Sequence, residues 1–345
     1  MTNPARSGPR TARRRRVLVA LSLVVVGLGL LPGASGASGS PGASATGYAQ
    51  IIQLEAQGGP SHCQLATVDL EAGTVYAIGP NSDISTAGCP FDMAFRADGR
   101  LYAVLNFDPV INNAKPSELV TIDPRTGARN LVGSLGFATR NGGLAFDAAG
   151  TLWLYAESMD SNCAGGVGQS CLYRLDPAHG IPTLVGTGNA SDQAIGATAS
   201  CDAVLANQLV QASMGPPSGR LVTLNTVTAA FRPAPQLYGA ILMVGLEIDS
   251  GGLLRGLAFS FDNTGNPQSP ATYAIDRATG VATKIADATP LASDRILAAL
   301  AIAGPTRYSG PSRSRVSPAR CRNRSSTRSP LAGDQGRGEL RSPAG

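Results

Sequence analysis

The chain repeats a unit of strands and turns about every fifty residues, and this period limits the possible folds more than any other feature. Four aspartates end apolar runs and are each followed four positions later by glycine, in the pairs Asp69–Gly73, Asp123–Gly127, Asp176–Gly180 and Asp276–Gly280. A second pattern recurs at other positions of the unit. In it, a glycine is followed two positions later by leucine, at Gly99, Gly150 and Gly252. A fixed period of this size indicates repeated supersecondary units.

Each unit contains four short runs with the character of β-strands. In the clearest unit these runs are 143–146 (GLAF), 151–156 (TLWLYA), 171–175 (CLYRL) and 181–185 (IPTLV). They are rich in Val, Leu, Tyr and Phe, and Gly, Pro and Asp bound them, as is typical of strands. None keeps helical spacing over a dozen residues. Four strands in a unit of this length predict a β-propeller blade.

The repeats predict an all-β, five-bladed propeller of four-stranded blades. Four blades are expected at about 91–133, 143–186, 200–234 and 242–286. The third is degenerate, because Asn225 and Ala229 stand where Asp and Gly are expected. A lone strand at Ile296–Ala303 would complete the fifth blade with three N-terminal strands, Tyr48–Glu55, Gln64–Leu70 and Thr74–Ile78. This closure removes open sheet edges. The alternative of six blades would need a further blade within 187–241, where the pattern is weakest.

The N-terminal residues have the character of an export signal. Arg13–Arg16 precede the mainly apolar run Val17–Leu31, which is shorter than the roughly 20 residues of a membrane span. We expect a cleaved signal at 1–37, a flexible linker at 38–46 and the propeller at 47–304; the alternative is an uncleaved anchor. The protein would then be exported, either secreted or in the periplasm or cell envelope, with no membrane span after signal removal.

The basic pI of about 9.0 comes from the two ends of the chain. Residues 46–304 carry 13 basic residues against 21 acidic ones, so the predicted propeller is acidic. This charge argues against nucleic acid as a partner. Residues 305–345 are rich in Arg, Ser and Pro and are expected to be disordered. Two hypotheses account for this segment: it is an adhesive basic tail, or it results from translation in a shifted reading frame.

The cysteines predict disulfides on one face of the ring. In a propeller, the connections from second to third strand and from fourth to first strand of the next blade emerge on the same face. All five cysteines of the predicted propeller lie at such connections: Cys63, Cys89, Cys163, Cys171 and Cys201. Disulfides agree with an oxidising compartment. Cys63–Cys89 is the first expected pair, and Cys171 then pairs with either Cys163 or Cys201. A metal site is disfavoured because CxxC is absent and histidine is scarce.

The same face carries the longer connections, so a ligand is expected at that mouth of the central channel. Polar residues near strand ends there are candidate ligand-binding residues: Asp92, Asn106, Asn141, Glu157, Asp202, Asp294 and Arg295. Converging carboxylates and amides could hold Ca²⁺. The alternative is that these groups cap strand ends and face water, since no EF-hand spacing occurs.

The sequence predicts no catalytic residue and no cofactor beyond that possible Ca²⁺. His62 is expected in a connection at the mouth and His179 in a turn on the opposite face, so they cannot share a metal ion or a catalytic dyad. No G-x-S-x-G motif and no Gly-rich phosphate loop before a helix occur.

Three stretches carry a resemblance to known proteins: 143–153 (GLAFDAAGTLW), 119–133 (LVTIDPRTGARNLVG) and 171–186 (CLYRLDPAHGIPTLVG). They resemble blades of exported bacterial propellers of the NHL, YVTN and lactonase-like groups. The lactonase-like enzymes imply a channel Ca²⁺ held by acidic and amide side chains, but no ligand can be matched to a residue here. We therefore expect an exported, non-catalytic recognition or scaffold module whose partner is a protein or a ligand of the cell envelope or exterior. The alternative is a Ca²⁺-dependent hydrolase or lyase acting in the channel.

Overall fold

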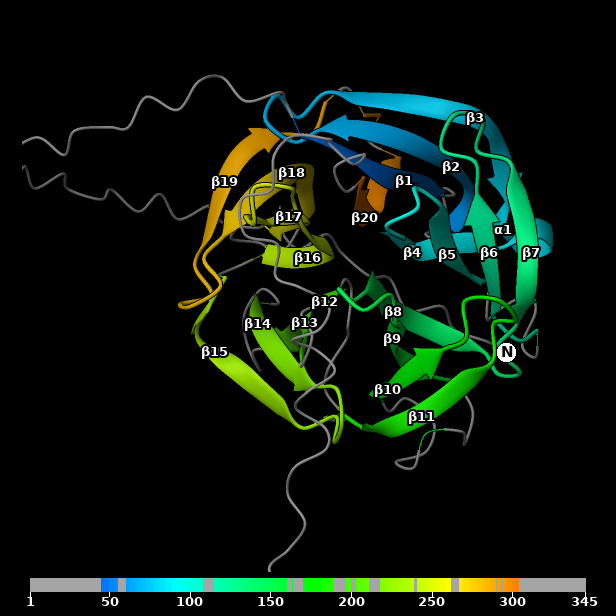
Figure 1. Cartoon of the computed structure of the whole chain (residues 1–345). Helices are drawn as coiled ribbons and strands as arrows, with labels where there is room; N and C mark the ends of the chain where they lie inside the picture. Colours follow the sequence, from blue (N-terminus) through cyan, green and yellow to red (C-terminus); the bar gives the residue numbers. More distant parts are fainter. Residues whose placement is uncertain are drawn as a thin grey trace, which may run out of the picture. The chain divides into compact units, whose positions relative to one another are not determined.

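The chain forms five four-stranded antiparallel sheets arranged as a β-propeller (Figure 1). The computed structural model describes residues 45–54, 60–107, 115–159, 163, 170–188, 197–199, 203–210, 218–238, 241–261, 267–289, 291–292 and 294–303. The prediction of five blades is therefore confirmed, and no sixth sheet occurs among these residues. The expected export signal at 1–37 and the tail at 305–345 lie outside them.

Four blades are each built from consecutive strands. Blade 1 contains β4 (Cys89–Phe95), β5 (Leu101–Asn106), β6 (Glu118–Ile122) and β7 (Arg129–Ser134). Blade 2 contains β8 (Thr139–Phe146), β9 (Leu152–Ser158), β10 (Ser170–Leu175) and β11 (Pro182–Thr187). Blade 3 contains β12 (Ala197–Ala199), β13 (Ala203–Val210), β14 (Ser218–Asn225) and β15 (Phe231–Leu237). Blade 4 contains β16 (Ile241–Ile248), β17 (Leu254–Phe261), β18 (Pro267–Ile275) and β19 (Ala282–Asp287).

The remaining sheet, the closing blade, joins the two ends of the propeller. Its order is β20-β1-β2-β3, where β20 is Arg295–Ile302, β1 is Thr46–Leu54, β2 is Pro60–Asp69 and β3 is Val75–Asp83. The antiparallel register places Gly47 opposite Ile302 and Gln53 opposite Arg295. In Figure 1 the orange β20 lies beside the blue β1. The predicted pairing of N- and C-terminal strands is thus confirmed.

The repeated Asp–Gly spacing forms the turn between the third and fourth strand of a blade. In the closing blade the Asp69 carboxylate accepts the backbone N–H groups of Glu71 and Ala72, each at 2.9 Å. The glycine that ends such a turn has positive φ, 73° at Gly127 for example, which costs glycine little. In blade 3 Ala229 takes this place at φ 56°, so the degenerate repeat keeps the turn in spite of its side chain.

Neighbouring blades enclose the hydrophobic core between them. One cluster, for example, joins Tyr102 and Leu119 of blade 1 to Leu144 and Leu154 of blade 2. At the rim, a glycine of one blade lies directly against backbone or outer-strand atoms of the next. These junctions are Gly73–Asp287, Gly79–Thr126, Gly133–His179, Gly186–Thr228 and Gly280–Gln236. The same contact thus recurs between every pair of neighbouring blades, including the pair that closes the ring.

Candidate functional site

The first strands of the blades, β4, β8, β12, β16 and β20, lie innermost and line the central axis (Figure 1). Counting each strand pair from its turn, Asp92 of β4 occupies the position of Gly143 in β8 and Gly245 in β16. A Cβ on Gly245 would collide with Leu300 of β20, which shows how closely these inner strands approach. Asp92 therefore places a carboxyl group at a position where blades 2 and 4 have glycine and hence no side chain.

Asp92 is almost fully buried, with 2% of its surface exposed, and both carboxylate oxygens are hydrogen-bonded to backbone. Oδ1 accepts the N–H of Met93 at 2.9 Å, and Oδ2 accepts the N–H of Leu144 in the neighbouring β8. Burial raises the pKa of Asp92 well above its usual range, and the negative charge of Glu247 in β16 adds to this. The two hydrogen bonds act in the opposite direction. Asp92 thus links the inner strands of blades 1 and 2.

Asn106, at the end of β5, belongs to a buried polar cluster with Ser117 and Thr139. Its Oδ1 accepts hydrogen bonds from the Ser117 hydroxyl at 3.1 Å and the Thr139 hydroxyl at 2.7 Å. The Ser117 hydroxyl also accepts the backbone N–H of Thr139 at 2.9 Å. These contacts join blade 1 to the start of β8. Sequence reasoning missed Ser117 and Thr139, because nothing in their local sequence shows that the fold brings them to Asn106.

The other candidate mouth residues do not gather into one site. Glu157 is half-buried and lies opposite Ser170 in the β9–β10 pair, whereas Asp294 is exposed. Arg295 is half-buried, and its buried Nε has no hydrogen-bond partner within the described structure. The Asn141 side chain and the whole of Asp202 lie outside the described residues. Among the residues that the structure describes, no group of three or more His, Cys, Asp or Glu side chains is placed to hold a metal ion.

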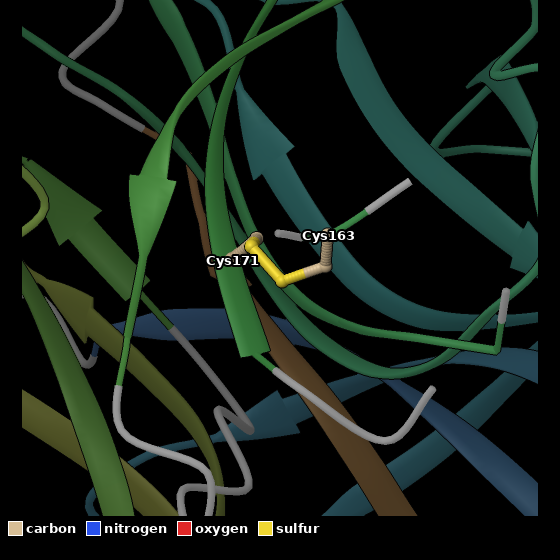
Figure 2. Close-up of a disulfide and its surroundings, with 2 residues drawn as sticks. All are labelled: Cys163 and Cys171. Atoms are coloured by element: carbon tan, nitrogen blue, oxygen red, sulfur yellow. A yellow bond between two sulfur atoms is a disulfide. The ribbon is translucent and has the colours of Figure 1, made fainter. Parts of the chain in front are cut away.

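The cysteines resolve one of the alternatives left by the sequence. Cys163 and Cys171 form a disulfide with a Cα–Cα distance of 5.9 Å (Figure 2). Cys171 therefore pairs with Cys163, while Cys201 lies outside the described residues. Cys63 and Cys89 are free, buried thiols, so the first expected disulfide is not formed in this structure.

The histidines lie at different places in the fold. His179, in the β10–β11 turn, is exposed, and its Nδ1 lies 2.7 Å from Asp176 Oδ2. His62 belongs to β2, where it lies opposite Gln53 and Asp83. Its expected position in a connection was wrong, because β2 begins earlier, at Pro60.

Structural comparison finds propellers from several kinds of protein. TolB from Acinetobacter baumannii matches with a TM-score of 0.43 and 14% identity over 75% of this chain and 66% of TolB. Exo-β-1,3-galactanase from Phanerochaete chrysosporium matches with a TM-score of 0.44 and 14% identity, over 71% of this chain and 67% of the enzyme. The periplasmic gluconolactonase of Pseudomonas aeruginosa matches with a TM-score of 0.39 and 13% identity, over 69% of this chain and 82% of the gluconolactonase. At such identities the likeness concerns the fold alone.

No protein-family model and no curated protein matches the sequence. Searched over its described residues, the chain contains no helix of the length and apolarity needed to cross a membrane.

Proposed function

We propose that this protein is a non-catalytic recognition or scaffold module that acts outside the cytoplasm. Its partner would be a protein or a ligand of the cell envelope or exterior, bound at the mouth where β5 leads to β6 and β19 to β20. The proposal includes export, for which the Cys163–Cys171 disulfide is the supporting structural observation, since disulfides persist in oxidising compartments. It includes no resident metal or cofactor and no nucleic-acid partner.

The bonding of Asp92 carries the proposal. Asp92 is the candidate mouth carboxylate on an inner strand, and backbone N–H groups already occupy both of its oxygens. Asn106 likewise directs its Oδ1 to Ser117 and Thr139. Polar groups used in this way stabilise the junction between blades, as buried hydrogen-bonded groups generally do. Recognition of a partner would then depend on exposed groups at the mouth, such as Asp294.

A pair of charge-matched variants tests whether the mouth face recognises a partner. Asp294→Ala with Arg295→Ala removes one acid and one base at the mouth. Asp98→Ala with Arg125→Ala removes the same charges from the turns on the opposite face. Tagged versions of both variants and of the unaltered chain are produced in the source cells, and quantitative mass spectrometry identifies what each retains. We expect the mouth variant alone to lose specific components; equal retention by all three forms would overturn recognition at this face.

A calcium measurement tests the non-catalytic part of the proposal. The purified chain is dialysed against Ca²⁺ at a concentration typical of extracellular fluid, and bound calcium is determined by elemental analysis. We expect no stoichiometric calcium. One bound ion per chain that is lost in Asp92→Ala, while the variant keeps its folded circular-dichroism spectrum, would instead support the Ca²⁺-dependent hydrolase or lyase.

A further inference from the structure

Cys63 and Cys89 place two thiols at the junction between the closing blade and blade 1. Cys63 lies in β2, whereas Cys89 is the first residue of β4, in a different sheet. The two side chains are 1% and 0% exposed and share a cluster with Ile52, Ile84 and Ala298. The Cys63 thiol lies 3.5 Å from the carbonyl oxygen of Gly88, the residue that precedes Cys89, so the two cysteines are neighbours across the junction.

A guanidinium group of blade 1 completes the arrangement. Arg129, at the start of β7, directs Nη2 to Cys63 Sγ at 3.5 Å. Its Nη1 donates to the carbonyls of Gly88 at 2.8 Å and Ala87 at 3.1 Å, which fixes the group beside the sulfur. Among the described residues, the hydrogen bonds of the Arg129 guanidinium include none to Cys89. The guanidinium therefore faces Cys63 in preference to Cys89.

These surroundings give the two thiols different chemistry. The hydrogen bond from Cys89 and the charge of Arg129 lower the pKa of Cys63 in spite of its burial. Burial raises the pKa of Cys89 well above its usual range. Cys63 is thus the thiol that more readily becomes the nucleophilic thiolate, and Cys89 is the one that holds its proton.

We propose that Cys63 and Cys89 form a disulfide that covalently joins the closing blade to blade 1, with Cys63 as the attacking thiol and Cys89 as the resolving thiol. The oxidant is a disulfide R–S–S–R, either a small-molecule disulfide or that of a thiol oxidoreductase. The Cys63 thiolate attacks one sulfur, forms a mixed disulfide and releases one thiolate. Cys89, after giving up its proton, attacks Cys63 Sγ and releases the second. The chain loses two electrons and two protons, and the co-reactant becomes two thiols.

The position of the pair gives this bond a defined structural role. Along the chain, β2 is connected to blade 1 through β3 and the short connection that contains α1 (Ile84–Ala87) and Gly88. The Cys63 thiol contacts the Gly88 carbonyl at 3.5 Å and shares its cluster with Ile84, so this connection packs against the Cys63 sulfur. Exchange in the folded chain therefore takes place when this connection opens locally. Once formed, the bond holds the closing blade against its neighbour at the place where the ring is closed.

Peptide mapping of the full chain tests the proposal without any substitution. Protein reduced under native conditions is incubated with oxidised glutathione, its free thiols are alkylated, and it is digested without reductant. We expect a peptide pair linked through Cys63 and Cys89, together with one linked through Cys163 and Cys171. Alkylated Cys63 and Cys89 after prolonged incubation, in a sample where Cys163–Cys171 has re-formed, would overturn the proposal.

Variants then test the assigned roles. Cys89→Ser should trap glutathione on Cys63 as a stable mixed disulfide, whereas Cys63→Ser should leave Cys89 largely unmodified; the reverse pattern would overturn the assignment. Arg129→Gln should slow formation of the Cys63–Cys89 bond by roughly tenfold, since a neighbouring cation favours the thiolate. Arg125→Gln, in the preceding turn, is the matched control and should leave the rate unchanged; an equal rate for both variants would contradict a role for Arg129.

Thermal unfolding gives a readout that is independent of mass mapping. A disulfide that spans this length of chain is expected to raise Tm by about 5–10 °C. The oxidised chain should lose this increment in the Cys63→Ser, Cys89→Ser double variant, in which Cys163–Cys171 remains intact. An oxidised Tm equal to that of the double variant would show that the bond does not stabilise the closure.

Discussion

Arg255 Nη2 lies 2.6 Å from Glu71 Oε1, which connects blade 4 to the closing blade across 184 positions of sequence. Arg255 Nε also lies 2.8 Å from Asp249 Oδ2, and both of these side chains are buried. The equivalent place in blade 2 is filled by Trp153, whose Nε1 donates to Asp147 Oδ2 at 3.0 Å. Asp147 and Asp249 lie in the turns between the first and second strands of their blades, and the residue six positions later donates a hydrogen bond to each of them. In blade 4 this residue is Arg255, which is long enough to reach the closing blade as well.

Substitution of Arg255 should separate the buried contact from the exposed one. Arg255→Met leaves the buried Asp249 carboxylate without its charged partner, and we expect it to lower the free energy of unfolding by about 3–5 kcal/mol. Glu71→Gln removes only the partner whose side chain is half exposed and should cost about 1 kcal/mol or less. Urea unfolding followed by circular dichroism measures both. Equal losses in the two variants would contradict the greater importance of the Arg255–Asp249 contact.

The architecture was predictable because its signals are local and repeated. The Asp69–Gly73 spacing and its copies arise from one turn geometry, in which the aspartate carboxylate binds backbone N–H groups and the glycine adopts positive φ. Because this turn occurs at regular intervals, the sequence shows a fixed period, and that period indicates the blades. Even the departure at Ala229 could be recognised, because the neighbouring turns define what the repeat requires. The closure by β20 followed from counting strands, since a ring leaves none unpaired.

The surroundings of the polar side chains could not be predicted in the same way. Asp92 was expected at the channel mouth, but its partner Leu144 belongs to the next blade, and the hydrogen bond between them depends on how closely β4 and β8 approach. Arg129 gave no local sign that it would face Cys63, 66 positions earlier. Interactions of this kind depend on the distances between blades, whereas the sequence pattern describes only the inside of a blade.

Substitution of Gly133 should show how tightly neighbouring blades pack. A Cβ at Gly133 would collide with the backbone carbonyl oxygen of His179 in the next blade, so Gly133→Ala forces the two blades apart. Gly150 has φ 82° but nothing within 4 Å of a Cβ, so Gly150→Ala reports the cost of backbone conformation alone. We expect losses of about 3 kcal/mol and about 1 kcal/mol respectively. Denaturant titration of both variants provides the comparison, and a smaller loss for Gly133→Ala would show that the junction yields easily.

The burial of Asp92 should make stability depend on pH in a defined direction. Its folded-state pKa is raised above the unfolded value of about 3.9. At pH values between these two pKa values, Asp92 is protonated in the folded chain and ionised in the unfolded chain. This group's contribution to stability is therefore greatest below about pH 4 and declines as pH rises through the folded pKa, by at most about 1.4 kcal/mol per pH unit. Asp92→Asn removes this dependence.

Unfolding measured from pH 4 to pH 8 tests this expectation. The unfolding free energy of Asp92→Asn should rise relative to that of the unaltered chain as the pH increases. Asp98→Asn, at an exposed turn next to the same strand, is the control for loss of a carboxylate. A constant difference between Asp92→Asn and the unaltered chain across this range would contradict the raised pKa of Asp92.

Removal of β20 should abolish the closed ring. A chain that ends at residue 294 loses the buried side chains of Leu297, Leu300 and Ile302, each worth about 1.5–3 kcal/mol, and exposes the β1 edge. Together with the lost hydrogen bonds, this approaches the whole stability of an ordinary domain, about 5–15 kcal/mol. We expect an unfolded or aggregated product by size-exclusion chromatography and circular dichroism. A chain that ends at residue 304 retains β20 and should elute as the full chain does. A folded, monomeric product from the shorter chain would show that the β1–β20 pairing is dispensable, because the exposed β1 edge would otherwise recruit another strand.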